Sequence, residues 1–266
     1  MRFTEGPAEL LERMEVYDCI RKRRSVRIYR DEPVSDEVVE ELLESARMAP
    51  CANNRQEWAF VVVRSGEVKK RILDAVVEIE TTLTQPAWKR LQVGGEPLKA
   101  MARSIGEFTG RNITMENINS QPDLRQLLED YTRRGVIELF RADVLIAVYR
   151  TAVEGLSVSI PNAFDTGAAI ENMLLAATAR GFGSVWAGGF SSSETKVEYR
   201  ATGMAIRAYH KDRISEILHA PKEMDLAAMV FIGRAASEPP MPPKKPLEQV
   251  AFRDQFGTPW KRSETP

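Results

Sequence analysis

The chain has 266 residues, 43% of them apolar and 28% charged, a composition typical of a globular protein that buries a substantial core. Its 37 basic and 38 acidic side chains balance, so no overall field would attract nucleic acid or anionic lipid, and any anion site must be a local cluster. Two cysteines are too few for a disulfide framework, and two histidines leave little room for metal or triad chemistry.

The N-terminal segment carries acidic residues and lacks the continuous apolar core of a signal peptide. No stretch reaches the roughly 20 apolar residues that a membrane span requires. Together with the low cysteine content, these features predict a soluble protein of the reducing cytoplasm that binds neither membrane nor nucleic acid. A redox reaction in such a chain would need an organic cofactor.

The first 80 residues predict three helices and one strand. Ser35 occupies an N-cap position, followed by acidic residues in the first turn and by apolar residues at helical spacing. That helix should end before Pro50. Trp58–Val63 is a short β-prone run, and further helices are expected over Val16–Lys22 and from about 68 to 79.

Glycines and prolines interrupt the helical pattern between about residues 80 and 141, which we interpret as a mostly helical insertion. Small residues fill the next predicted helix, Pro161–Arg180, and would let a second helix approach closely; Gly181 would cap its C-terminal end. The other predicted elements are strands at Asp143–Tyr149, Gly183–Ala187 and Leu226–Ile232, a helix at Arg213–Leu218 and a proline-rich stretch at Pro239–Pro246. This order predicts an α+β fold in which helices enclose a central sheet, as a single domain over residues 1–266 with an extended C-terminal arm at about 235–266.

A basic run near the N-terminus contains Arg23, Arg24, Ser25 and Arg27. Guanidinium groups bind phosphate in a bidentate way and a serine hydroxyl adds a neutral donor, so these side chains could form a phosphate cradle. The alternative is a solvated basic turn. Arg234, after the last predicted strand, and Lys244 and Lys245 on the proline-rich arm are surface cations by themselves, but they could close the same site.

Amide side chains gather between the second predicted helix and the first strand, in the segment 50–58 (PCANNRQEW). Amides offer both hydrogen-bond donors and acceptors, which match the alternating nitrogen and oxygen atoms along the edge of a heteroaromatic ring. Asparagines at a helix end are equally ordinary turn formers.

A glycine-rich segment surrounds the predicted strand Gly183–Ala187. Its glycines would let backbone N–H groups approach a flat ring. They follow a helix rather than open one, so the segment is not the dinucleotide-binding fingerprint of a Rossmann fold.

Taken in this order, these motifs resemble the nitroreductase superfamily. The residues that carry the resemblance are RRSVR at 23–27, APCANNRQEW at 49–58, DTGAAIENMLLAATARGFGSVW at 165–186, and IGR at 232–234 before a basic, proline-rich tail. The resemblance covers about two thirds of the chain and excludes the stretch 80–141. It implies a homodimer with a central, mostly antiparallel sheet and FMN bound between the subunits.

The resemblance also implies roles for individual residues. The basic run would hold the ribityl phosphate and part of the ring, joined by Arg234 and Lys245, and Arg23 would stabilise negative charge on the flavin. The remaining residues expected to contact the cofactor are Pro50, Cys51, Ala52, Asn53, Gln56, Trp186, Ala187, Gly188 and Gly189. The second subunit would complete each site, so the segment 50–56 would face a flavin held largely by its partner.

Two departures from the family pattern stand out. The family commonly has serine where this chain has Cys51, which is either an isostere or a thiol near the flavin, and it has proline where this chain has Glu57. The expected activity is ping-pong electron transfer from NADH or NADPH to a small organic acceptor such as a quinone or nitroaromatic compound. A specialised flavin reaction such as reductive dehalogenation, with the insertion as a lid, and a flavin-binding protein without turnover are the alternatives.

Overall fold

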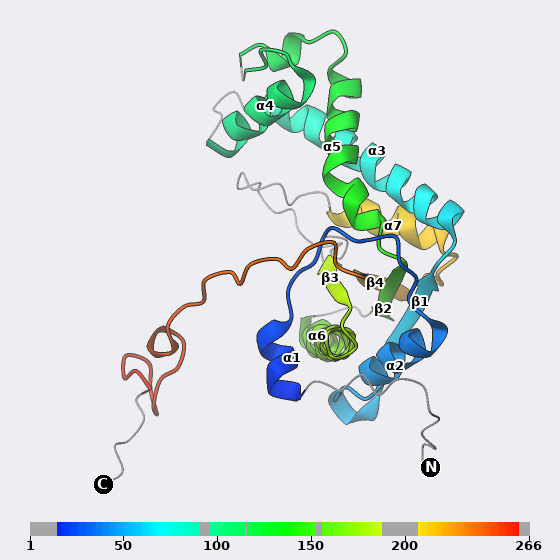
Figure 1. The fold of residues 1–266 in the computed structure, drawn as a ribbon, viewed down its shortest axis with the longest axis vertical. Helices are drawn as coiled ribbons and strands as arrows, with labels where there is room; N and C mark the ends of the chain where they lie inside the picture. The colour runs from blue at the N-terminus through cyan, green and yellow to red at the C-terminus, as the bar shows by residue number, and fades with distance from the viewer. Residues whose placement is uncertain (1–14, 91–95, 115, 153–155, 188–206, 261–266) are drawn as a thin grey trace.

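The computed structural model describes residues 15–90, 96–114, 116–152, 156–187 and 207–260, which form helices around one sheet (Figure 1). Its elements in chain order are α1 Val16–Lys22, α2 Asp36–Arg47, η1 Ala52–Asn54, β1 Trp58–Val63, α3 Gly66–Arg90, α4 Glu96–Thr109, η2 Ile118–Ser120, α5 Leu124–Phe140, β2 Val144–Thr151, α6 Leu156–Ala179, β3 Gly183–Ala187, α7 Arg207–Ile217, β4 Met224–Gly233 and η3 Leu247–Gln249. The α+β class expected from the sequence is confirmed.

The sheet has four strands in the order β1-β2-β4-β3, and all three pairings are antiparallel. β2 and β4 occupy the centre and are almost fully buried. β3 forms one edge of this sheet. There, residue Ser25 of the N-terminal loop makes a single parallel bridge to Ser184, which brings the basic run of the sequence against the strand.

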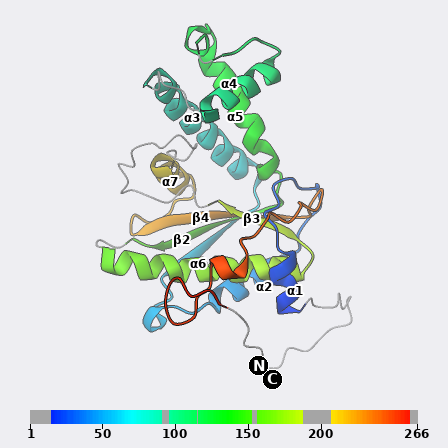
Figure 2. The same cartoon turned by 90° about the vertical axis from the view of Figure 1, so that its left-hand side faces the viewer.

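Helices cover both faces of the sheet, and the central strands alternate their side chains between two cores. Ile146 of β2 and Val230 of β4 pack toward α2 and α6, whereas Leu145 and Phe231 pack toward α3 and α7. Figure 2 shows α1, α2 and α6 on one side of the sheet and α3, α5 and α7 on the other. Burial on both faces explains why these strands are continuous apolar runs in the sequence.

The helix α2 begins as the sequence predicts. Ser35 is its N-cap and its hydroxyl accepts a hydrogen bond from the backbone N–H of Val38. The start of α6 differs from the expectation, because this helix begins at Leu156 and not at Pro161. A proline costs the helix one backbone hydrogen bond, and packing of the helix against the sheet outweighs that loss. The predicted C-terminal cap is present: Gly181 has φ +71° and follows the last turn.

The stretch expected to be mostly helical is built from the end of α3, from α4 and from α5. α3 continues through Pro86, which the sequence pattern suggested as an interruption. α4 and α5 enclose a small core of their own around Ile105, Ile118 and Leu128. An ion pair from Arg133 on α5 to Asp74 on α3, at 2.9 Å, helps to join these helices to the body.

The chain after β4 contains no helix longer than η3 within residues 234–260. It leaves the sheet, passes the N-terminal loop and extends away from the body (Figure 1). Its exposed apolar side chains are Met241, Leu247, Val250, Phe256 and Trp260. Within the described parts of the chain, no helix is both long and apolar enough to span a membrane.

Candidate functional site: a basic cavity beside the sheet edge

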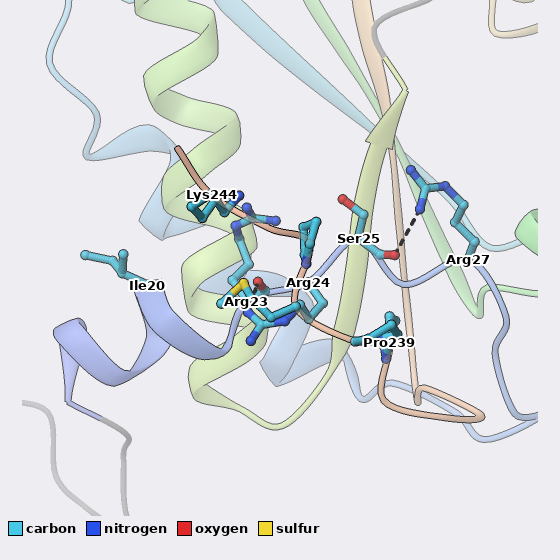
Figure 3. A pocket seen from close by; sticks show the side chains of 10 residues that line it. Ile20, Arg23, Arg24, Ser25, Arg27, Pro239 and Lys244 are labelled. Carbon is cyan, nitrogen blue, oxygen red and sulfur yellow. Dashed lines mark hydrogen bonds between the residues drawn. The ribbon is translucent and has the colours of Figure 1, made fainter. Parts of the chain in front are cut away.

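A cavity of about 360 Å³ lies between the end of α1, the N-terminal loop and the start of the C-terminal arm. Its basic and polar lining consists of Arg23, Arg24, Ser25, Arg27 and Lys244, and its apolar lining of Ile20 and residues 239–242. Figure 3 shows Arg23, Arg24 and Lys244 close together, with Arg27 further away beyond Ser25. All four residues of the basic run therefore line one cavity.

The sheet edge fixes the loop that carries these cations. The backbone N–H of Val26 donates to the carbonyl of Ser184 at 3.1 Å, and the Val26 side chain is only 5% exposed. Gly183 permits this close approach, because a Cβ at that position would lie 2.8 Å from both γ-carbons of Val26.

Tyr29 fastens the same loop to the central strand β4. Its buried hydroxyl donates to the carbonyl of Val26 at 2.7 Å and lies 3.2 Å from the carbonyl of Phe231. Burial raises the pKa of Tyr29 far above its usual value, although the nearby Arg27 acts in the opposite direction. The phenol therefore stays a neutral donor, and the loop is held at a fixed distance from the sheet.

The three guanidinium groups are constrained to different degrees. Arg24 donates from Nη1 to the carbonyls of Arg21, at 2.5 Å, and Arg23, at 2.8 Å, while its Nε is buried without a hydrogen-bond partner in the described structure. Arg23 pairs through Nε with Glu171 on α6 at 3.2 Å. Arg27 donates from Nη1 to the carbonyl of Ser25 at 3.2 Å.

These features fit a phosphate monoester such as the phosphate of FMN. A buried cationic group with an unpaired donor is costly, and an anion in the cavity would offset the positive charge of the Arg24 guanidinium. Glu171 offsets only part of the surrounding positive charge, which comes from three arginines and Lys244. The cavity volume is at the lower end of the roughly 300–1,000 Å³ of small-molecule sites.

Two cations expected at this site do not line the cavity. Arg234 instead donates to the carbonyl of Gly181 at 3.1 Å, and its guanidinium carbon lies 4.2 Å from the centre of the Phe182 ring. Lys245 is exposed and also lies outside the lining, whereas the neighbouring Lys244 belongs to it. The arm thus contributes one of the two lysines that the sequence offered.

The amide-rich segment lies apart from this cavity, on a short loop between α2 and β1. Asn53, Asn54 and Gln56 have φ values of 54°, 54° and 51°, in the left-handed region, and their side chains are exposed. Cys51 accepts a hydrogen bond at Sγ from the backbone N–H of Gln56 at 3.3 Å. Ala52 donates its backbone N–H to Asp165 of α6 at 3.0 Å. Pro50, at the start of the segment, also lies outside the cavity lining.

Glu57, which replaces the proline of the family pattern, is tied into the structure. Its carboxylate accepts from the Nδ2 of Asn162 at 3.4 Å and lies 3.8 Å from the Nε of Arg55. A carboxylate is acceptable here because the buried Asn162 supplies a donor.

The last predicted segment is only partly described. Trp186, on the edge strand β3, has a half-exposed indole, and Ala187 is partly buried. Gly188 and Gly189 lie outside the described residues. The motifs missed the role of Glu171 on α6, which pairs with Arg23. They also missed the arm residues 239–242, because only the three-dimensional path of the arm brings these to the cavity. No cluster of His, Cys, Asp and Glu in the described parts of the chain could hold a metal ion.

An antiparallel sheet between two helical layers, with a basic cavity at its edge, defines this α+β protein. The nitroreductase family model matches residues 20–234. This chain therefore belongs to the nitroreductase family, as its motifs indicated.

Individual relatives match over shorter stretches. A nitrobenzene nitroreductase of Ectopseudomonas oleovorans is 44% identical over 61 residues, which are 23% of this chain and 26% of that protein. Iodotyrosine deiodinase 1 of Rattus norvegicus is 36% identical over 66 residues, 25% of this chain and 23% of that protein. The matches to the curated relatives thus span about a quarter to a third of those proteins' length.

Solved structures share the fold over most of the chain. A BluB-like flavoprotein of Clostridium difficile 630 has a TM-score of 0.59 and 23% identity, covering 91% of this chain and 100% of that one. A mutant of an FMN- and NADPH-dependent nitroreductase from Sphigopyxis sp. strain HMH has a TM-score of 0.56 and 21% identity, with coverage of 91% and 100%. These structures establish a nitroreductase-like fold.

Proposed function

We propose that this chain is an FMN-dependent oxidoreductase that transfers electrons from NADH or NADPH to a small organic acceptor such as a nitroaromatic compound or a quinone. The observation that carries the proposal is the basic cavity, whose lining of Arg23, Arg24, Arg27 and Lys244 beside Ser25 offers the donors that a phosphate requires. Membership of the nitroreductase family and an FMN-dependent structural neighbour point to the same cofactor.

The protein's part in this reaction is to bind and orient the flavin. Arg24, Ser25, Arg27 and Lys244 would hold the phosphate, and Arg23, partly neutralised by Glu171, would place positive charge toward the ring. When bound, FMN would supply the redox chemistry of a ping-pong transfer from the nicotinamide to the acceptor. Because the cofactor carries the electrons, the site needs no classical acid–base pair.

We propose further that the active form is a homodimer in which each subunit completes the other's site. α6 exposes Phe164 and Gly167 on one face, and α1 exposes Val16, Tyr17 and Ile20. Apolar side chains gathered on helices around a cofactor cavity favour an interface. In that assembly the segment 50–56, which lies outside the cavity of its own chain, would face the partner's flavin.

Reductive dehalogenation is the second candidate for the reaction. The match to an iodotyrosine deiodinase favours it. The helices α4 and α5 of the predicted insertion would then serve as the lid over the substrate. We place the enzyme in the cytoplasm, because two cysteines are too few for the disulfide framework of a small secreted protein.

The cofactor proposal is tested on protein purified from a flavin-replete host. We expect a yellow protein that releases FMN, and not FAD or riboflavin, on denaturation. A colourless protein that takes up no added FMN would refute the proposal, and the basic run would then be a solvated turn.

A further inference from the structure

We infer that Asp165 and Asn162, one turn apart on α6, are positioning residues for the loop 52–57. They hold this loop in the left-handed conformation that would present Asn53 and Gln56 to the flavin. The inference rests on the proposed function for the flavin contact, but the loop's restraint can be measured without any flavin.

The loop needs an external restraint because its backbone is strained. Asn53, Asn54 and Gln56 all have positive φ within four residues. Asparagine tolerates this region, whereas glutamine rarely adopts it. Such conformations persist where the surrounding structure determines them, and they gather at functional sites.

Asp165 restrains the N-terminal end of the loop. Its Oδ2 accepts a hydrogen bond from the backbone N–H of Ala52 at 3.0 Å. Ala52 directly precedes Asn53, the first residue of the loop with a left-handed backbone. A charged acceptor makes this a stronger bond than an amide carbonyl would. Within the loop, Arg55 donates its backbone N–H to the carbonyl of Ala52 at 3.2 Å, so fixing Ala52 fixes the turn that follows.

Asn162 restrains the C-terminal end. Only 2% of this residue is exposed, and its Nδ2 donates both to Glu57 at 3.4 Å and to the carbonyl of Thr151 at 3.1 Å. The hydroxyl of Thr166 donates to the carbonyl of Asn162 at 2.8 Å and lies 3.5 Å from its Oδ1. Glu57 supplies the acceptor that proline could not, which gives the departure from the family pattern a function.

One helical turn of α6 therefore holds both ends of the loop, since residues three apart share a helix face. Between the two anchors, Asn53, Asn54 and Gln56 are exposed, and the Nε2 of Gln56 donates to the Oδ1 of Asn54 at 3.1 Å. Their amides would be aligned before the ring arrives, so less conformational freedom would be lost on binding.

The test compares Asp165→Ala and Asp165→Asn with a matched control, Asn172→Ala. Asn172, also on α6, donates instead to the carbonyl of Ser45 on α2 at 3.1 Å. Hydrogen exchange of the amides of residues 52–56 is measured on the full chain without flavin, and FMN affinity is measured by quenching of flavin fluorescence.

We expect Asp165→Ala to speed exchange of these amides and weaken FMN binding, each about tenfold, which corresponds to loss of one charged hydrogen bond. Asp165→Asn should restore much of both, because its Oδ1 can still accept, and Asn172→Ala should change neither. Unchanged exchange in Asp165→Ala, or equal effects in Asn172→Ala, would overturn the inference. If the wild-type chain bound no FMN, the proposed function would fail, while the exchange data would still decide whether Asp165 holds the loop.

Discussion

The side chain of Arg24 has two separate roles. Its Nη1 satisfies two carbonyls at the C-terminal end of α1, where backbone acceptors lack helical partners, and the same side chain lines the cavity. A lysine would not be equivalent, because its ammonium concentrates its donors at one point and lacks the planar fork that binds phosphate in a bidentate way. The residue thereby links the local fold of the basic run to its affinity for phosphate.

Arg24→Ala should reduce FMN affinity by roughly 10- to 100-fold, since a charged hydrogen bond to the phosphate is lost. Riboflavin, which has the same ring but no phosphate, should bind the variant nearly as well as it binds the wild type. Isothermal titration with both flavins measures the two affinities. Equal losses for FMN and riboflavin would show that Arg24 acts on the fold or the ring and not on the phosphate.

The edge strand β3 is the element that places the cavity. Its backbone at Ser184 receives the N-terminal loop, and Gly183 leaves the space that Val26 occupies. The loop therefore depends on a close contact between two backbones, which any side chain at position 183 would disturb.

Gly183→Ala should lower the free energy of unfolding by about 1–3 kcal/mol, because its new Cβ overlaps Val26 in a packed region. It should also weaken FMN binding by moving the basic run. Gly135→Ala is the matched control: a Cβ there meets nothing within 4 Å, and the change should stabilise α5 by about 0.5–1 kcal/mol. Urea denaturation measures the free energy of unfolding of both variants. An unchanged value for Gly183→Ala would contradict the close contact between Gly183 and Val26.

The sequence predicts elements well where local chemistry decides them. Ser35 begins α2 as its hydroxyl chemistry requires, and Gly181 ends α6 through its positive φ. The predictions were wrong at prolines: α6 begins before Pro161 and α3 continues through Pro86, because packing along a long helix compensates for one missing hydrogen bond.

The same distinction, between features set by local sequence and features set by the folded chain, applies to the cavity. The basic run is contiguous and was visible as a motif, but no local pattern shows that the arm contributes Lys244 while Arg234 packs on Phe182. Those two positions depend on the path of the arm after β4, which only the folded chain defines.

At the scale of the whole molecule, the arm carries apolar side chains that are exposed among the described residues. Phe256 is 91% exposed and touches the ring of Phe252, with ring centres 5.1 Å apart. An aromatic side chain in such a place contributes little to folding of its own chain, and it suits an interface with a second copy.

Phe256→Ala should raise the dissociation constant of the proposed homodimer at least tenfold, as loss of a buried aromatic anchor does. The urea midpoint of the dissociated chain should remain unchanged, because its own fold leaves the ring in solvent. Sedimentation velocity over a dilution series measures the dissociation constant. An unaltered constant would show that the arm does not bind the partner through this ring.

The central claim is turnover of FMN between a nicotinamide and an organic acceptor. The most direct measurement follows the visible flavin absorbance of the purified protein without oxygen, first on addition of NADPH or NADH and then of menadione or a nitroaromatic compound. The account predicts bleaching by at least one nicotinamide and full recovery with the acceptor. A flavin that binds but is never bleached, or is bleached and never reoxidised by any acceptor, would contradict it and indicate a flavin-binding protein without this activity.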